Sequence, residues 1–228
     1  MTSLLERTIS IIAPHHCFSC SKESNVLCEA CALQVFGDAL AACVLCGAPT
    51  IDAKICKGCA SQTVLRHVWV ASEYDGVVKR LIQAYKFERL KAAAIPLAAG
   101  MADALPYLGE DVLVVHVPTA TNRIRQRGYD QSKLLAREIA RLRGWRHVPA
   151  LRRKHQLRQV GSTRAQRQVQ ALQAFEWTGV DIAGAHVLLV DDVTTSGATL
   201  VAAAKILAAA GAARVDAVTC AKQVLEKA

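Results

Sequence analysis

One segment of thirteen residues, 187–199, constrains the fold of this chain more than any other, and its sequence is VLLVDDVTTSGAT. Four consecutive aliphatic residues are typical of a strand that is buried on both faces of a parallel sheet. Asp191 and Asp192 follow at the carboxyl end of this strand, where open α/β sheets bind their ligands. Because neighbouring side chains on a strand point to opposite faces, we expect different roles for the two carboxylates. One would meet sugar hydroxyls, and the other would orient nearby backbone or a magnesium shell.

The turn that follows the two aspartates is short, rich in hydroxyl groups and placed at the start of a helix. Gly197 allows the backbone of this turn to approach a ligand closely. Successive amides at a helix start, joined by side-chain hydroxyls, form a cradle for a phosphate. Acids that bind a diol, followed at once by such a cradle, predict a ribose 5-phosphate site. Its residues are Asp191, Asp192, Thr194, Thr195, Ser196, Gly197, Ala198 and Thr199. The plainer interpretation is an apolar strand that ends in two acids before a capped helix. Each of these features is common alone, but their combination within thirteen consecutive residues disfavours this interpretation.

Strand and helix patterns alternate along most of the chain after residue 66. Apolar residues recur at helical spacing over 77–90, 95–105, 130–142 and 198–210, and short apolar runs predict strands over 112–117, 187–190 and 214–220. Strand, helix and strand in this order predict right-handed crossovers and an α/β fold with a parallel sheet. Residues 152–168 carry charge without apolar periodicity, so we expect a mobile loop that leads into a helical turn.

Eight of the nine cysteines precede residue 60 and form four CxxC pairs. Each pair directs two thiolates toward one point, and two pairs complete a tetrahedral zinc site. The pattern predicts two structural zinc ions bound by Cys17, Cys20, Cys28, Cys31, Cys43, Cys46, Cys56 and Cys59. Neighbouring pairs would form a double zinc ribbon, whereas alternate pairs would form a cross-braced module, and the spacing permits both. We therefore expect a small zinc module over residues 1–62 and an α/β domain over residues 66–228. The ninth cysteine, Cys220, is most simply a small buried hydrophobe.

Positive charge is concentrated in residues 121–170, where 14 Lys or Arg stand against Asp130 and Glu138. Such a stretch attracts polyanions such as nucleotides or nucleic acid, although cations scattered on solvated helices explain it equally well. No apolar run approaches the length of a membrane span, and Glu6 and Arg7 lie where a signal peptide needs apolar residues. We therefore expect a cytoplasmic protein with no membrane span.

The segment 187–199 resembles the motif with which type I phosphoribosyltransferases bind phosphoribosyl pyrophosphate (PRPP), with Ser196 where many members have threonine. The resemblance implies that Asp191 and Asp192 contact the ribose hydroxyls, that residues 195–199 hold the 5-phosphate, and that magnesium accompanies PRPP. It also implies a pyrophosphate loop in HVPTATNRIRQRGYDQ, residues 116–131. The candidate residues there are Pro118, Thr119, Ala120, Arg123, Arg125 and Arg127.

Motifs along nearly the whole chain resemble those of the ComF/GntX family, the late-competence proteins linked to DNA uptake in natural transformation. In order they are the cysteine module, YDGVVKRLIQAYKFERL (74–90), RGYDQ (127–131), RQVGSTRAQR (158–167) and the PRPP motif. The family often has RGFN where this chain has Tyr129 and Asp130, so neither residue is given a catalytic role. The resemblance implies a double zinc ribbon joined to a phosphoribosyltransferase domain, with other competence proteins as partners.

Two functions fit this sequence. In the first, the protein is a phosphoribosyltransferase whose Arg123, Arg125 and Arg127 neutralise pyrophosphate. The loop with Arg158, Arg164 and Arg167 would then close over the site. In the second, the protein binds a ribose phosphate without turnover, and its basic stretch engages single-stranded DNA. The sequence identifies no pocket for an acceptor substrate.

Overall fold

The computed structural model describes residues 15–36, 41–154 and 174–223 of the chain. A five-stranded parallel sheet forms its centre, with the strand order β1-β7-β6-β2-β3. The strands are β1 (Leu65–Glu73), β2 (Val112–His116), β3 (Arg146–His147), β6 (His186–Thr194) and β7 (Arg214–Lys222). A separate antiparallel pair consists of β4 (Leu151–Arg153) and β5 (Phe175–Trp177). The prediction of an α/β fold with a parallel sheet is therefore confirmed.

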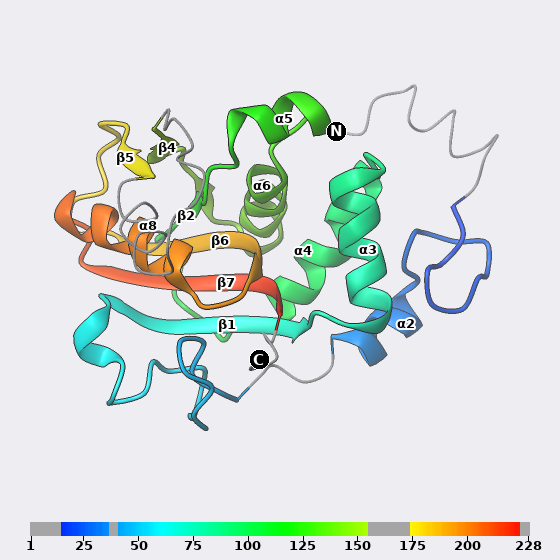
Figure 1. Cartoon of the computed structure of the whole chain (residues 1–228), viewed down its shortest axis with the longest axis horizontal. Coiled ribbons are helices and arrows are strands. Elements are labelled where there is room, and N and C mark those ends of the chain that lie inside the picture. The colour runs from blue at the N-terminus through cyan, green and yellow to red at the C-terminus, as the bar shows by residue number, and fades with distance from the viewer. Residues whose placement is uncertain (1–14, 37–40, 155–173, 224–228) are drawn as a thin grey trace, which may run out of the picture.

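Helices cover both faces of the sheet (Figure 1). The helices α3 (Gly76–Phe87), α4 (Ala94–Asp103) and α6 (Gln131–Arg143) share one apolar cluster, and α8 (Ala198–Ala209) belongs to the cluster on the other face. Side chains of β2 alternate between the two, since Val112 and Val114 join the first cluster and Leu113 and Val115 the second. Two 3₁₀ turns, η1 (Ala60–Gln62) and η2 (Lys91–Ala93), and two shorter helices, α2 (Glu29–Val35) and α5 (Thr121–Arg127), complete the described elements.

The strands differ from the prediction in two places that matter for the site. No element was predicted over residues 65–73, where the structure has β1, because Arg66 and His67 interrupt the apolar run at its start. The strand predicted over 187–190 continues to Thr194 as β6, because β7 runs beside it as far as Lys222. Both aspartates therefore lie within the strand and not after it.

The segment predicted as a mobile loop, 152–168, begins differently from that expectation. Arg152 and Arg153 belong to β4 and pair with Glu176 and Phe175 of β5. These two residues are ordered because β5 supplies their backbone partners. Residues 155–168 lie outside the described residues.

The two cysteine-rich segments pack on opposite faces of the sheet. The first carries α2, which lies beside α3 and α4 in Figure 1, and its Phe36 ring abuts Gly100 of α4. The second precedes β1 and follows its outer edge, where Ile55 N–H donates to the Arg66 carbonyl and Val68 N–H to the Ala53 carbonyl. Its backbone thereby covers part of an edge strand that would otherwise be open to solvent.

Among the helices described, none is long and apolar enough to cross a membrane.

A buried carboxylate joins three strands at the amino end of the sheet. Asp216 of β7 is fully buried and accepts hydrogen bonds from His67 of β1, His186 of β6 and Arg214 of its own strand, at 3.0, 2.8 and 2.6 Å. The backbone N–H of His67 is a further donor to it, at 3.0 Å. Asp216 therefore fixes the relative positions of β1, β6 and β7.

We expect Asp216→Ala to lower the free energy of unfolding by about 3 kcal/mol, because it leaves Arg214, both histidine rings and the His67 N–H without their acceptor. Urea unfolding of the variant beside wild type measures this change. Asp103→Ala removes an exposed carboxylate and serves as the control. Equal losses in the two variants would contradict the assigned role of Asp216.

Candidate functional site

The carboxyl end of β6 extends beyond its neighbour β2. The pairing of these strands ends at His116 with Val190, and the Val117 N–H still donates to the Val190 carbonyl. From Asp191 onward β6 is paired with β7 alone. Asp191 and Asp192 thus stand at an edge of the sheet that no described strand covers, which is the position where such sheets bind ligands.

The two aspartates have different partners. Asp191 Oδ1 accepts hydrogen bonds from the Ser132 hydroxyl and from the Asp192 N–H, both at 2.9 Å. Asp192 Oδ1 accepts one from Lys86 Nζ at 2.8 Å, and both side chains of this ion pair are largely buried. The expectation that the two carboxylates differ in role agrees with this difference in surroundings.

Burial raises the pKa of Asp191 to about 7, and the adjacent carboxylate of Asp192 acts in the same direction. The hydrogen bonds from Ser132 and from the Asp192 N–H, together with the charge of Lys86, oppose this rise. A carboxyl group with such a pKa is only partly ionised near neutral pH. Perturbed groups of this kind cluster at functional sites.

The turn after β6 is open to ligand. The side chains of Thr195, Ser196 and Thr199 are exposed, whereas Thr194 is buried within the sheet. Gly197 caps α8 with φ +74° and offers no side-chain hydrogen bond to the helix start. Among the residues that the structure describes, none accepts a hydrogen bond from the amides of residues 195–200. These amides are therefore free to bind an anion.

The loop between β2 and α5 is tied to α6 by one carboxylate. Asp130 accepts hydrogen bonds from the Thr119 N–H and hydroxyl, and also from the Lys133 N–H as the N-cap of α6, each at 3.1 Å. Tyr129 is buried, and its hydroxyl donates to the Tyr85 carbonyl. The two residues that depart from the RGFN pattern thus hold the loop in place.

The predicted pyrophosphate residues occupy unequal environments. Pro118 is buried, Thr119 and Ala120 are half-buried, and Arg123 and Arg125 are exposed on α5. Arg127 is buried, donates to Gln131 Oε1 at 3.1 Å and lies over the Phe87 ring. Arg123 and Arg125 are thus available to a ligand, whereas Arg127 is held within the protein. The predicted loop arginines, Arg158, Arg164 and Arg167, lie outside the described residues.

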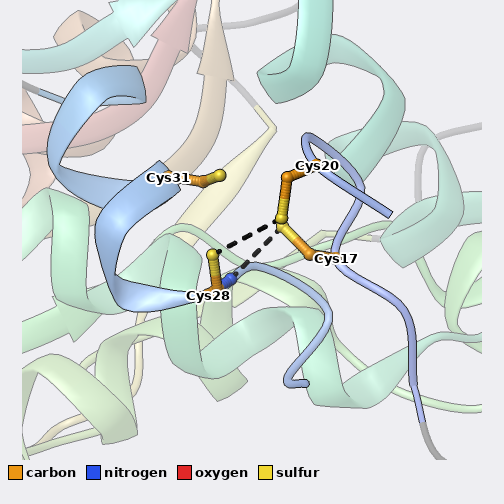
Figure 2. Close-up of side chains that lie close together, drawn as sticks. All are labelled: Cys17, Cys20, Cys28 and Cys31. Carbon is orange, nitrogen blue, oxygen red and sulfur yellow. Dashed lines mark hydrogen bonds between the residues drawn. The ribbon is translucent and has the colours of Figure 1, made fainter. Parts of the chain in front are cut away.

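The cysteines form two groups of four, and each group consists of neighbouring pairs. Cys17, Cys20, Cys28 and Cys31 make one, and Cys43, Cys46, Cys56 and Cys59 the other, with all sulfurs of a group within 4.8 Å of one another. Figure 2 shows the first group converging from a loop and from the start of α2. This arrangement excludes the cross-braced alternative.

Both groups fit a tetrahedral zinc ion. A Zn–S bond of about 2.3 Å places two ligand sulfurs roughly 3.8 Å apart. The sulfurs of Cys20 and Cys28 lie 3.8 Å apart, and those of Cys46 and Cys56 lie 3.5 Å apart. All nine cysteines are free thiols, so no disulfide competes for them. The two tetrads could therefore each hold one zinc ion.

The family described as "Phosphoribosyl transferase domain" matches residues 90–226, which include both aspartates, the turn and the loop after β2. The chain belongs to this family.

Two further comparisons give relatives of this phosphoribosyl transferase domain protein. "Competence protein ComFC" of Bacillus subtilis (strain 168) is 25% identical over 182 residues, which are 75% of this chain and 73% of that protein. This relative confirms the predicted membership of the ComF family. A solved structure described as the allosteric regulatory enzyme of purine biosynthesis is 19% identical, with a TM-score of 0.39 over 56% of this chain. The chain spans only 25% of the length of that enzyme.

Three residues that reach the site of this phosphoribosyl transferase domain were not predicted as site residues. Lys86 and Ser132 contact the aspartates from α3 and α6, and Arg153 of β4 lies 3.5 Å from the Pro118 carbonyl. Lys86 lies in the stretch 74–90, which resembles a motif of the ComF/GntX family, but the resemblance predicts no role for this lysine. No local signal in the sequence pairs this lysine with Asp192, because the contact joins residues 106 positions apart.

The raised pKa of Asp191 makes stability depend on pH. An unperturbed aspartate has a pKa of about 3.9, so between about pH 4 and pH 7 the folded protein keeps a proton that the unfolded chain has lost. The contribution of this group is therefore fully present below about pH 4 and is lost as pH rises through the folded pKa.

We expect Asp191→Asn to remove this loss, because an amide does not titrate in this pH range. The amide oxygen can still accept from Ser132 and from the Asp192 N–H, so these hydrogen bonds are kept. The stability of wild type should fall relative to the variant between about pH 4 and about pH 7, by about 1.4 kcal/mol per unit of pKa displacement. Melting temperatures measured across this range show the fall. Asp111→Asn, at an exposed position, should follow wild type. A constant difference between wild type and Asp191→Asn at every pH would refute the assignment.

Proposed function

We propose that this protein binds PRPP, as its magnesium complex, at the carboxyl end of β6. The observation that carries the proposal is the sequence of groups along one stretch of backbone. Two carboxylates at an open sheet edge are followed directly by a turn whose amides and hydroxyls have no described partner. Carboxylates accept hydrogen bonds from a diol, and a helix start binds a phosphate. Ribose 5-phosphate carries both groups.

Each part of the site then has one task. Asp191 and Asp192 accept hydrogen bonds from the ribose hydroxyls, and the turn at residues 195–199 binds the 5-phosphate. The exposed Arg123 and Arg125 neutralise pyrophosphate. Lys86 balances the charge of Asp192 until the ligand arrives. Magnesium comes with PRPP and not from a resident site, since it prefers substrate phosphates with few protein ligands.

The reaction that such a site supports is transfer of the phosphoribosyl group. The bond between the anomeric carbon and a pyrophosphate oxygen breaks, and an acceptor nucleophile forms a bond to that carbon. The protein's contribution is to hold the sugar in place and to stabilise the charge that develops on pyrophosphate. Pyrophosphate release from PRPP with a panel of bases and nucleotides tests whether turnover occurs.

Binding is tested by titration of Mg-PRPP and of ribose 5-phosphate. We expect wild type to melt at a higher temperature in either ligand and Asp191→Asn/Asp192→Asn to show at least a tenfold weaker affinity, about 1.4 kcal/mol. The matched control is Glu110→Gln/Asp111→Asn, which neutralises two adjacent, exposed acids before β2. Equal stabilisation of all three proteins would contradict the placement of the site at Asp191 and Asp192 of β6.

A second candidate is a binding module for single-stranded DNA. The favouring observation is that Arg123 and Arg125 are exposed on α5, beside the loop after β2. In this version the ribose-phosphate site holds a terminal nucleotide, and affinity falls steeply with salt because binding releases counterions. The competence name of the relative accords with a role in DNA uptake, together with other competence proteins. PRPP turnover without DNA binding would exclude this version.

We also propose that residues 1–62 hold two structural zinc ions, one in each cysteine-rich segment, and that both segments pack on the domain of residues 66–228. A four-thiolate site has no open coordination position, so its zinc contributes folding energy and not catalysis. Reduced thiolates of this kind accord with a cytoplasmic location.

Elemental analysis of purified protein should give two zinc ions per chain. Cys46→Ser/Cys56→Ser should retain one, because the tetrads share no ligand. Cys220→Ala changes a cysteine outside both tetrads and should keep two. Retention of two zinc ions by the double variant, or a wild-type content near zero, would contradict the assignment.

A further inference from the structure

The second cysteine tetrad contacts the turn that is proposed to hold the sugar phosphate. Leu45 lies between two of its ligand cysteines, in Cys43-Val44-Leu45-Cys46. A Cβ atom placed on Gly197 would lie 2.5 Å from Leu45 Cδ2 and 3.6 Å from Val44 Cγ1. The leucine side chain therefore packs directly on the backbone of Gly197, in space that only a glycine leaves open.

The residues near Leu45 in the chain are attached to the α/β domain. Val44 is buried in the apolar cluster of α8, and Lys222 Nζ of β7 lies 3.4 Å from the Cys43 carbonyl. The far end of the same tetrad is bonded to β1 through Ile55 and the Arg66 carbonyl. The Cys43–Cys46 turn that carries Leu45 is thus attached to the sheet on which the site is built.

The turn itself has few internal restraints. Gly197 is in the left-handed region with φ +74°, and the amides of residues 195–200 have no acceptor among the described residues. A backbone without internal hydrogen bonds keeps its shape only where neighbouring groups pack against it. Leu45 supplies such a contact on the side of the turn formed by Gly197.

The first tetrad makes different contacts. The carbonyl of Phe18 accepts from Arg80 of α3 at 2.9 Å, and Phe36 packs on Gly100 of α4. These contacts lie on the opposite face of the sheet from α8. The chain thus offers two chemically similar tetrads, of which one touches the turn.

We propose that Leu45 is a positioning residue for the turn at residues 195–199, and that the second tetrad holds it there. This inference rests on the proposed ribose-phosphate site. Leu45 then sets the affinity for the 5-phosphate end of the ligand and leaves the pyrophosphate end unaffected, because the loop at residues 117–120 is held separately by Asp130.

The test compares ribose 5-phosphate and magnesium pyrophosphate as probes in isothermal titration. We expect Leu45→Ala to weaken ribose 5-phosphate about tenfold and to leave pyrophosphate unchanged, with two zinc ions still bound. Leu45→Met should restore the affinity, because methionine has a similar volume and adapts to an irregular space. Leu33→Ala, at an exposed leucine of α2 beside the first tetrad, is the matched control and should bind like wild type.

A second variant tests the contact from the other side. Gly197→Ala should weaken ribose 5-phosphate, both by the clash with Leu45 and by its positive φ. Leu45→Ala in that background should relieve the clash, so the two effects should not add. Strict additivity of the two effects would overturn the contact.

The outcomes separate this inference from the proposed function. If wild type fails to bind ribose 5-phosphate, the proposed function is wrong. If wild type binds it and Leu45→Ala binds it equally, only the positioning role fails. Tighter binding by Leu45→Ala would show that the leucine obstructs the site, which also overturns the inference.

Discussion

The site depends on a difference in length between neighbouring strands. β6 continues four residues beyond the last pair that it makes with β2, while β7 supports it on the other side to Lys222. A strand paired on one edge keeps its extended shape and still exposes the groups on its free edge. Asp191 and Asp192 are therefore rigidly placed and accessible at once. The turn to α8 begins directly after this rigid strand, and Leu45 packs on it at Gly197.

The same geometry concentrates charge that the fold must balance. Burial raises the pKa of Asp191, and repulsion from the adjacent carboxylate of Asp192 adds to the rise. Lys86 offsets the charge of Asp192, and Ser132 supplies a hydrogen bond to Asp191 without adding charge. A site that keeps one acid partly protonated is less stable than an uncharged one, which is the usual cost of function in a fold. A ligand that brings hydroxyl donors and its own cation relieves this cost.

The local parts of this site could be predicted from the sequence, because they lie in one run of residues. Apolar β6, both aspartates, Gly197 and the alanine-rich α8 each have a signature in their own neighbourhood. Lys86, Ser132 and the contact of Leu45 could not be predicted, since they arrive from other elements through tertiary packing. The pairing of the CxxC motifs was undecided for the same reason, because both pairings satisfy the spacing. β1 was missed because Arg66 and His67 break the apolar pattern at its start, and the His67 ring is there bonded to Asp216 of another strand.

Gly197 is determined both by its local sequence and by tertiary packing. Its presence in the turn is explained locally by a positive φ, and the proposed phosphate contact would give a second reason. The structure adds a third reason, since Leu45 of the second tetrad occupies the space of a side chain. A residue that is restricted by its own backbone, by a ligand and by a neighbouring module cannot change without cost to any of the three. The cysteine module is thus part of what shapes the turn, and a substitution at Gly197 affects more than the phosphate contact alone.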